Sequence, residues 1–302
     1  MDIPSRASLS APRQAWHWLR AAPWAALAEL ACRAGYVARG AVYLSIGLVG
    51  LLAAARLTPH ATGALGALEA WADWPFGVVM LSLAGLGLWG FSGWRFLQSV
   101  FDADRLGSSP MALLTRTGQL VSGLVYAGLA VSLWGLIGAL DGLREVDERA
   151  RTEAAVGAVL DMPAGGAMVV AAGMFILAAG VGGIVQALFA GFSHRLSGQR
   201  DTRLPAALLG RLGYLARGIA FLPAGAFMVT AGWHARASEA KGLGGALDAL
   251  SALPFGHAAL GAIAVGLIAF GAYALFEARF RPMRLSGARR LRTPRRRARS
   301  SP

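Results

Sequence analysis

The sequence has a single cysteine, Cys32, and a single lysine, Lys241, among its 302 residues. One cysteine cannot form an intrachain disulfide, and it cannot by itself build a cysteine-based metal centre. Five histidines are present, but none of them stand at the close spacings that zinc sites use. We therefore predict no metal site and no cofactor.

Catalytic motifs are also missing. The sequence contains neither G-x-S-x-G nor H-E-x-x-H, and GFSHR at 191–195 lacks the second glycine of the first motif. The prediction is that the protein is not an enzyme, and no catalytic residue is assigned.

Charged residues are scarce and apolar runs are long. Only 15% of the residues are charged, 56% are hydrophobic, and the mean hydropathy is +0.52. A helix needs about 20 apolar residues to cross a bilayer. Three uncharged runs meet that length, and three more do so when flanking arginines are included. The six runs are 34–55, 76–97, 117–140, 162–193, 212–233 and 249–276. The composition predicts an all-α integral membrane protein with six transmembrane helices.

Basic residues are distributed unequally between the two sides that six spans create. The side holding both termini carries 23 Arg or Lys residues, and the other side carries 6. Basic residues remain on the cytoplasmic side of bacterial inner membranes. We expect a multi-pass protein of the plasma membrane with both termini in the cytoplasm.

Both terminal segments have compositions suited to the membrane surface. Residues 1–32, with three tryptophans and Glu29 interrupting the apolar stretch, predict an interfacial amphipathic segment and not a signal peptide. Residues 284–302 are polybasic and poor in apolar residues, which predicts a disordered tail attracted to anionic lipids. Nonspecific nucleic-acid binding is the alternative partner for this tail.

Two sequence blocks recur along the chain. The first opens one helix of each pair, as RAGYVARG at 33, RTGQLVSG at 116 and RLGYLARG at 211. The second precedes the other helix, as GALEAWADWPFG at 66, GALDALSALPFG at 245 and a shortened VLDMPAG at 159. We predict three two-helix repeats, at 33–110, 111–200 (degenerate) and 201–283. Because each contains an even number of spans, the three hairpins should be parallel, with a pseudo-threefold arrangement.

The R-x-G-Y-x-A-R-G block followed by G-A-L-[ED]-A and P-F-G resembles a bacterial membrane family catalogued as domain of unknown function 1206. The resemblance extends over about 33–281, and the middle copy departs from it at Gln119, Ser122 and its PAG turn. Members of that family carry the two-helix unit three times. The resemblance implies fold and membrane location, and it implies no activity.

The opening block places an arginine and two aromatic residues on one helix face. Tyr36, Arg39 and Tyr43 stand at i, i+3 and i+7, and Tyr214 and Arg217 match the first two of these. Glycines continue this face and are expected to pack against other helices. These glycines are Gly40, Gly47, Gly123, Gly218, Gly225 and Gly232.

Arg39 and Arg217 have two interpretations. In the favoured one they anchor the cytoplasmic helix ends by reaching toward the headgroups. In the alternative they point into the bundle and bind an anion or an anionic lipid headgroup, supported by Tyr36 and Tyr214. Glu277, which aligns with Gln98 and Gln186, is expected to be an interfacial charge, with pairing to one of these arginines as the alternative.

The sequence does not identify a biochemical activity. We expect a structural or interaction component of the membrane. The alternative is a transporter, channel or lipid- or anion-binding protein that uses a pocket at the cytoplasmic side of the bundle.

Overall fold

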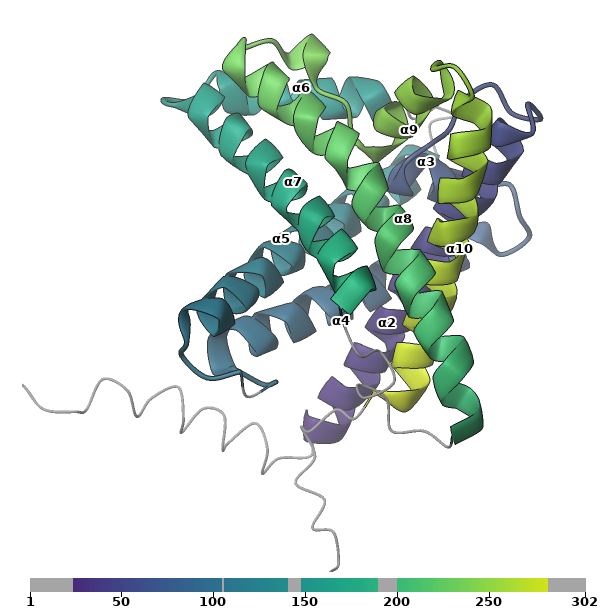
Figure 1. Cartoon of the computed structure of the whole chain (residues 1–302), viewed down its shortest axis with the longest axis vertical. Coiled ribbons are helices and arrows are strands. Elements are labelled where there is room, and N and C mark those ends of the chain that lie inside the picture. The colour runs from purple at the N-terminus through teal and green to yellow at the C-terminus, as the bar shows by residue number, and fades with distance from the viewer. Residues whose placement is uncertain (1–23, 105, 141–147, 190–199, 282–302) are drawn as a thin grey trace, which may run out of the picture.

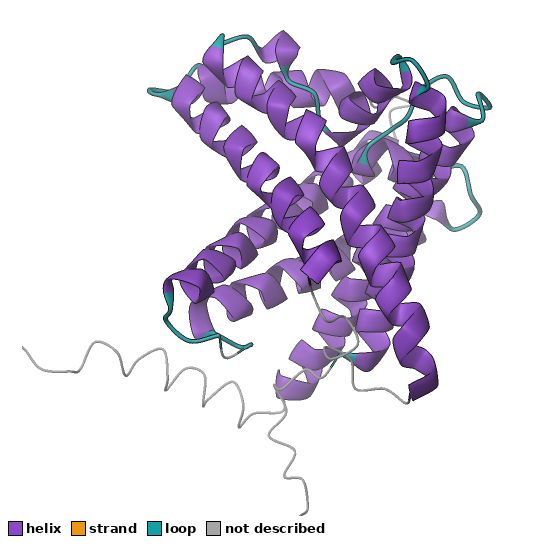
Figure 2. Cartoon of the chain, in the orientation of Figure 1, coloured by secondary structure: helices purple, strands orange, loops and turns teal. Residues whose placement is uncertain are grey.

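The computed structural model describes residues 24–104, 106–140, 148–189 and 200–281. Within these ranges the regular structure is entirely helical (Figure 2). The polybasic tail 284–302 and most of the predicted interfacial segment lie outside the described residues. Residues 24–32 of that segment belong to the first described helix.

In the described residues, six long helices have the length and hydropathy needed to cross a membrane. They are α2 (Trp24–Ala54), α4 (Gly77–Phe101), α5 (Pro110–Leu140), α7 (Gly165–Phe189), α8 (Arg200–Trp233) and α10 (Gly256–Phe280). The predicted fold class, an all-α protein with six membrane-spanning helices, is confirmed.

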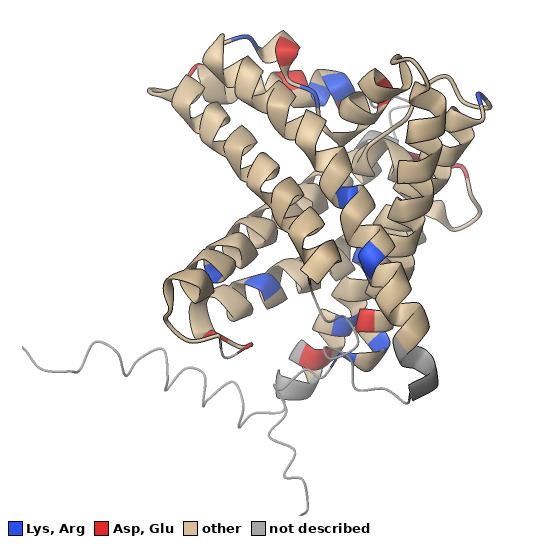
Figure 3. Cartoon of the chain, viewed as in Figure 1, with Lys and Arg blue, Asp and Glu red and all other residues tan. Residues whose placement is uncertain are grey.

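Shorter helices connect the long ones at one end of the bundle, uppermost in Figure 1. They are α3 (Ala64–Glu69), α6 (Glu148–Leu160), the 3₁₀ turn η3 (Ala237–Glu239) and α9 (Leu243–Ser251). We call this end the connector side, and the end where α2 begins and α10 finishes the terminal side. Figure 3 shows that charged residues gather toward these two ends, with few along the helices between them.

A tight turn starts the second helix of each pair. The residue before the first glycine of that helix has a left-handed backbone in all three helix pairs, at Phe76, Ala164 and Phe255. A Cβ on the following glycine would collide with a carbonyl oxygen of the connector, such as that of Trp71 for Gly77. Glycine is therefore required here by close backbone approach.

The long helices pack in the order α5–α4–α2–α10–α8–α7. Long helices that follow each other in the sequence are in extensive contact, except α5 and α7. The last helix, α10, also contacts the first, α2. Such a contact between α5 and α7 would therefore close the six helices into a ring. These two helices make no extensive contact, and the α4/α5 and α7/α8 pairs diverge in Figure 1. The first and third pairs form the expected hairpins. The middle pair differs from that expectation.

The glycine of the R-x-G block shows why the middle pair differs. A Cβ on Gly35 would lie 2.5 Å from the backbone nitrogen of Phe91, and one on Gly213 would lie 2.5 Å from the Cα of Phe270. Gly118, the middle counterpart, has no atom within 4 Å of such a Cβ. The close approach that unites α2 with α4 and α8 with α10 is therefore absent between α5 and α7.

Contacts between successive pairs use matching positions. A Cβ on Gly40 would approach the carbonyl oxygen of Gly271, and one on Gly218 would approach that of Gly180. Gly123 meets Ser92 in the same way, and the Ser92 hydroxyl donates to the Gly123 carbonyl (2.8 Å). The glycines predicted from the sequence to pack against other helices all lie at contacts of this kind. They are Gly40, Gly47, Gly123, Gly218, Gly225 and Gly232.

Candidate functional site

A buried ion pair joins α2 to α10. Nη2 of Arg39 lies 2.9 Å from Oε2 of Glu277, and the two side chains are only 3% and 6% exposed. Arg39 lies six residues after Arg33 on α2, which is about 9 Å further from the terminal side. Arg33 itself donates hydrogen bonds to carbonyl oxygens in the last turn of α10. Arg39 therefore points inward and does not reach toward the headgroups. The interfacial position expected for Glu277 is wrong, because this carboxylate closes the pair from inside the bundle.

Three arginines and two phenylalanines alternate across the interior. The guanidinium of Arg39 lies 5.1 Å from the ring centre of Phe91 and 4.9 Å from that of Phe270. The guanidinium of Arg95 lies 5.0 Å from the ring centre of Phe91, on which Arg39 also lies, and that of Arg217 lies 5.3 Å from the ring centre of Phe270. Each cation is thus stabilised by ring faces in a region of low dielectric constant.

Arg217 has no carboxylate within 4.0 Å among the described residues, although it occupies the position on α8 that Arg39 occupies on α2. Its Nε donates to the hydroxyl of Tyr43 (3.1 Å), and its guanidinium lies 4.4 Å from the ring centre of Phe221. Tyr43 in turn meets the hydroxyl of Tyr126 on α5. Arg217 is therefore oriented by aromatic residues from three helices, but its charge is not balanced.

The register of the helices explains this difference. The α8·α7 contact repeats the α2·α10 contact, since Gly218 meets Gly180 as Gly40 meets Gly271. Glu277 stands six residues after Gly271, and the residue six after Gly180 is Gln186. An uncharged amide therefore stands in the position that supplies the carboxylate to Arg39.

A polar network continues from the ion pair to the terminal side. Arg281 donates to the second carboxylate oxygen of Glu277 (3.1 Å) and to Asp104 (3.3 Å). Asp104 also accepts from the side-chain amides of Gln98 (2.6 Å) and Gln119 (3.3 Å). Two carboxylates thus balance Arg39 and Arg281. Arg95, which donates to the amide oxygen of Gln98, and Arg217 remain without a counter-charge in this part of the chain.

The first arginine of the opening block binds the end of a neighbouring helix. Arg33 donates to the carbonyl oxygen of Ala278 (2.7 Å) on α10, and Arg116 donates to that of Ser99 (2.7 Å) on α4. Cations at helix C-termini satisfy free carbonyl groups and complement the helix dipole. These two arginines therefore fix helix ends, and the second arginine of the block has the different, interior role described above.

The four sequence-predicted site residues lie in one aromatic cluster. Tyr36 is fully buried, packs edge-on against Phe91 and accepts a hydrogen bond from Arg281. Tyr214 packs against Phe270 at 5.1 Å. Arg39 and Arg217 flank this same phenylalanine.

Sequence reasoning missed the phenylalanines at the centre of the cluster. Phe91 and Phe270 both stand 16 residues after the proline that precedes their helix, Pro75 and Pro254, and that equal offset was the available signal. Arg281 and Asp104 gave no comparable signal, because each stands among other charged residues at a helix end, beside Arg279 and Asp102, and no pattern distinguishes it from them. No group of three or more potential metal ligands occurs in the described part of the chain.

Comparisons with known proteins find a family and a relative of unknown function. The family profile described as Domain of Unknown Function (DUF1206) matches residues 34–102 and 212–281, which are the first and third helix pairs. The chain is similar to "Uncharacterized protein YxxB" of Bacillus subtilis (strain 168), with 27% identity over 254 residues, covering 83% of this chain and 90% of the relative. No solved structure matches the chain. The predicted resemblance to this bacterial membrane family of unknown function is confirmed over both matched regions.

Proposed function

We propose that this membrane protein binds a phosphate-bearing anion at Arg217. The observation that carries the proposal is the missing counter-charge: Arg39 has Glu277, whereas the position on α7 that matches Glu277 in register holds Gln186. A cation inside a membrane is costly unless it is paired, and such residues usually mark binding sites or pathways.

The surroundings of Arg217 favour anion binding over a purely structural role. The Tyr43 hydroxyl accepts from Nε, and among the described residues no hydrogen-bond acceptor engages the edge formed by the two terminal guanidinium nitrogens, which a ligand could therefore bind. Guanidinium groups bind phosphate through two parallel N–H donors. The same chemistry suits a lipid headgroup that enters between α5 and α7 and a free phosphate that enters from water. The experiment must therefore separate these two sources.

The test compares the wild type with Arg217→Gln and with Arg211→Gln. Arg211 is an exposed arginine on the same helix, so its variant matches the change in charge without touching the interior. Native mass spectrometry of protein extracted gently from its own membrane reports bound phospholipid. Titration of delipidated protein with inorganic phosphate reports the free anion.

A phospholipid that stays with the wild type and Arg211→Gln, and is lost from Arg217→Gln, identifies the lipid source. Phosphate binding with the same dependence identifies the free anion. Arg217→Lys retains the charge and controls for folding, so it should keep part of the binding. Equal ligand occupancy in all variants, or none in the wild type, would overturn the proposal.

A second candidate function is that of an interaction component of the membrane. It is favoured by the apolar faces of α5 and α7, where Leu124, Val131 and Val181 are all more than half exposed. Photo-crosslinking residues at these three positions should capture one defined protein, whereas the same residue at exposed Val79 on α4 should not. Uniform labelling of lipid from all four positions would contradict this role.

We further propose a binding protein without catalytic function, located in the bacterial plasma membrane, with its terminal side in the cytoplasm. Support comes from the 23 basic residues on that side against 6 on the other. The matched glycine contacts support an origin from three tandem two-helix repeats. The arginine-rich segment 284–302 would add affinity for anionic lipids. A reporter fused to the carboxyl end tests the topology.

A further inference from the structure

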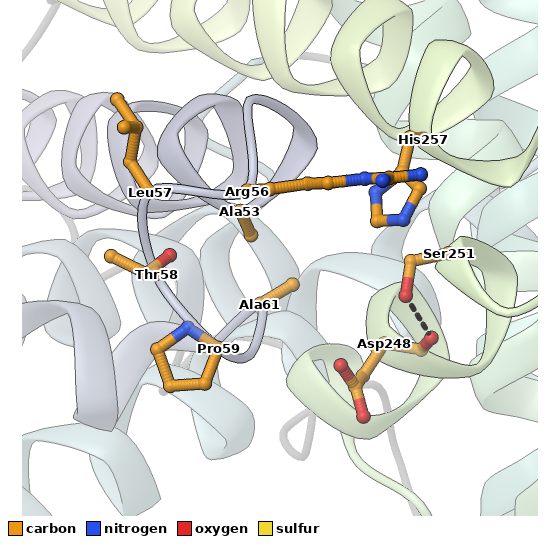
Figure 4. A pocket seen from close by; sticks show the side chains of 9 residues that line it. All are labelled: Ala53, Arg56, Leu57, Thr58, Pro59, Ala61, Asp248, Ser251 and His257. Atoms are coloured by element: carbon orange, nitrogen blue, oxygen red, sulfur yellow. Dashed lines mark hydrogen bonds between the residues drawn. The ribbon is translucent and has the colours of Figure 1, made fainter.

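A second candidate site lies on the connector side, where α2 ends. It is separated along α2 from Tyr43, the residue of that helix that binds Arg217. A cavity of about 420 Å³ opens there between the end of α2, the loop after it, α9 and the first turn of α10. Figure 4 shows its polar side chains, which are Arg56, Thr58, Asp248, Ser251 and His257. Cavities of this size accommodate small molecules.

Opposite charges line this cavity without neutralising each other. Arg56 forms no ion pair among the described residues, and in Figure 4 its guanidinium extends toward His257 while Asp248 lies on the facing wall. Asp248 has only a 3.4 Å contact with His60, whose side chain is 73% exposed. A positive and a negative group are thus presented separately to whatever enters.

The backbone fixes the position from which Arg56 reaches into the cavity. Arg56, two residues after the end of α2, has a left-handed backbone, φ 60°, and the Leu57 amide donates to the carbonyl oxygen of Leu52 (2.9 Å). Glycine is the usual residue at this position of a helix end. Arginine is less favourable there than glycine, although the matching position after α8 also holds a non-glycine residue, Ala235 (φ 50°).

Two polar atoms beside the cavity have no hydrogen-bond partner. They are the hydroxyl oxygen of Thr58 and Nδ1 of His257, both closed off from solvent. Rotation of Thr58 about χ1, or a half-turn of the His257 ring, redirects these atoms. Buried polar groups normally have partners, so a ligand that supplies one gains affinity.

We propose that this cavity binds a small zwitterion of amino-acid type. Its carboxylate pairs with Arg56, with Thr58 and His257 as further hydrogen-bonding groups. Its ammonium group pairs with Asp248, whose backbone carbonyl is held in place by the hydroxyl of Ser251 (2.6 Å). The two opposite charges, held apart across one cavity, favour a ligand that carries both signs.

The test uses the full chain in phosphatidylcholine nanodiscs. Each of the twenty amino acids is screened by thermal shift, and the best binder is titrated by calorimetry. The corresponding hydroxy acid, which lacks the ammonium group, is titrated in parallel. Arg56→Gln and Asp248→Asn remove one charge each. Arg236→Gln is the control, since Arg236 is also exposed on the connector side and pairs with Glu239 instead.

We expect one or more amino acids to bind the wild type and the control equally. Each cavity variant should bind at least tenfold more weakly, as should the hydroxy acid with the wild type. Arg56→Lys should retain part of the affinity. Failure of all twenty amino acids, or unchanged binding by Arg56→Gln, would overturn the proposal. Equal binding of the hydroxy acid would replace the zwitterion by a simple anion. Arg217→Gln should leave this affinity unchanged, so the two sites are tested independently.

Discussion

The α2·α10 and α8·α7 interfaces are built alike but differ in one charge. Both bring a glycine of the opening block against a glycine of the partner helix, and both carry an arginine one residue before that first glycine. At one interface Glu277 completes a buried ion pair, and at the other Gln186 does not. The comparison shows how replacing one carboxylate by an amide can turn a closed structural contact into an available cation.

Removing the carboxylate of Glu277 should have the largest effect on stability, because it breaks the ion pair of the α2·α10 interface. Glu277→Gln leaves Arg39 buried in an apolar interior without its counter-charge. Such losses destabilise proteins by about 3–5 kcal/mol. Thermal unfolding in matched detergent micelles measures the change, with exposed Arg211→Gln as the control.

The double variant Arg39→Met, Glu277→Met separates the cost of an unpaired charge from the value of the pair. Replacement of both buried charges by apolar groups is often nearly neutral. Recovery of most of the lost stability is therefore expected. A double variant as unstable as Glu277→Gln alone would mean that the pair itself, and not the orphaned arginine, dominates.

Glycine packing at the α8·α7 interface offers a second test of the comparison, with a smaller expected effect on stability. A Cβ on Gly218 would lie 2.7 Å from the carbonyl oxygen of Gly180, so Gly218→Ala forces α8 and α7 apart. Overpacking of this kind costs about 1–3 kcal/mol. Gly128→Ala on α5 is the matched control, because nothing lies within 4 Å of its Cβ. Alanine favours the helix there by up to about 1 kcal/mol. Equal effects from the two variants would contradict the described packing.

Adding the missing carboxylate makes the two interfaces alike. Gln186→Glu should pair with Arg217 as Glu277 pairs with Arg39. Because the added carboxylate supplies the counter-charge that Arg217 lacks, stability should rise, by about 1 kcal/mol, which is less than the loss in Glu277→Gln because Arg217 is only half-buried. Phosphate or phospholipid binding at Arg217 should nevertheless be lost, as measured by native mass spectrometry. Persistent binding in Gln186→Glu would show that the ligand lies elsewhere.

The sequence predicted what repeats and what is apolar. Hydropathy located six spans, and glycines at fixed offsets located the tight helix contacts. The opening between α5 and α7 could not be predicted, because Gly118 is retained in the block while its contact is not. The sequence does not specify the partner of Arg39 for a related reason. Pairing across α2 and α10 depends on which helices become neighbours, and no local pattern near Glu277 specifies that.

On the connector side, Glu148 links the two helix pairs, α4/α5 and α7/α8, that diverge from each other. Its carboxylate on α6, the helix that leads into α7, accepts the backbone N–H of Gly63 (2.8 Å), just before α3. α3 itself packs against α2 and α5. Burial is the main cause that raises the pKa of Glu148, the nearby charge of Glu69 acts in the same direction, and the amide hydrogen bonds oppose it.

A raised pKa means that folded Glu148 holds its proton more tightly than the unfolded chain does. The stability it contributes is complete below the ordinary glutamate pKa, about 4.3, and is lost as pH rises through the raised value. Glu148→Gln keeps an acceptor for Gly63 without the buried charge. The variant should therefore equal the wild type at pH 4 and become the more stable protein by pH 8, by about 1 kcal/mol or less. Unfolding midpoints at both pH values measure this. A variant less stable than the wild type at pH 8 would mean that the charged hydrogen bonds to α3 outweigh desolvation, and that the link between the two helix pairs depends on the ionised carboxylate.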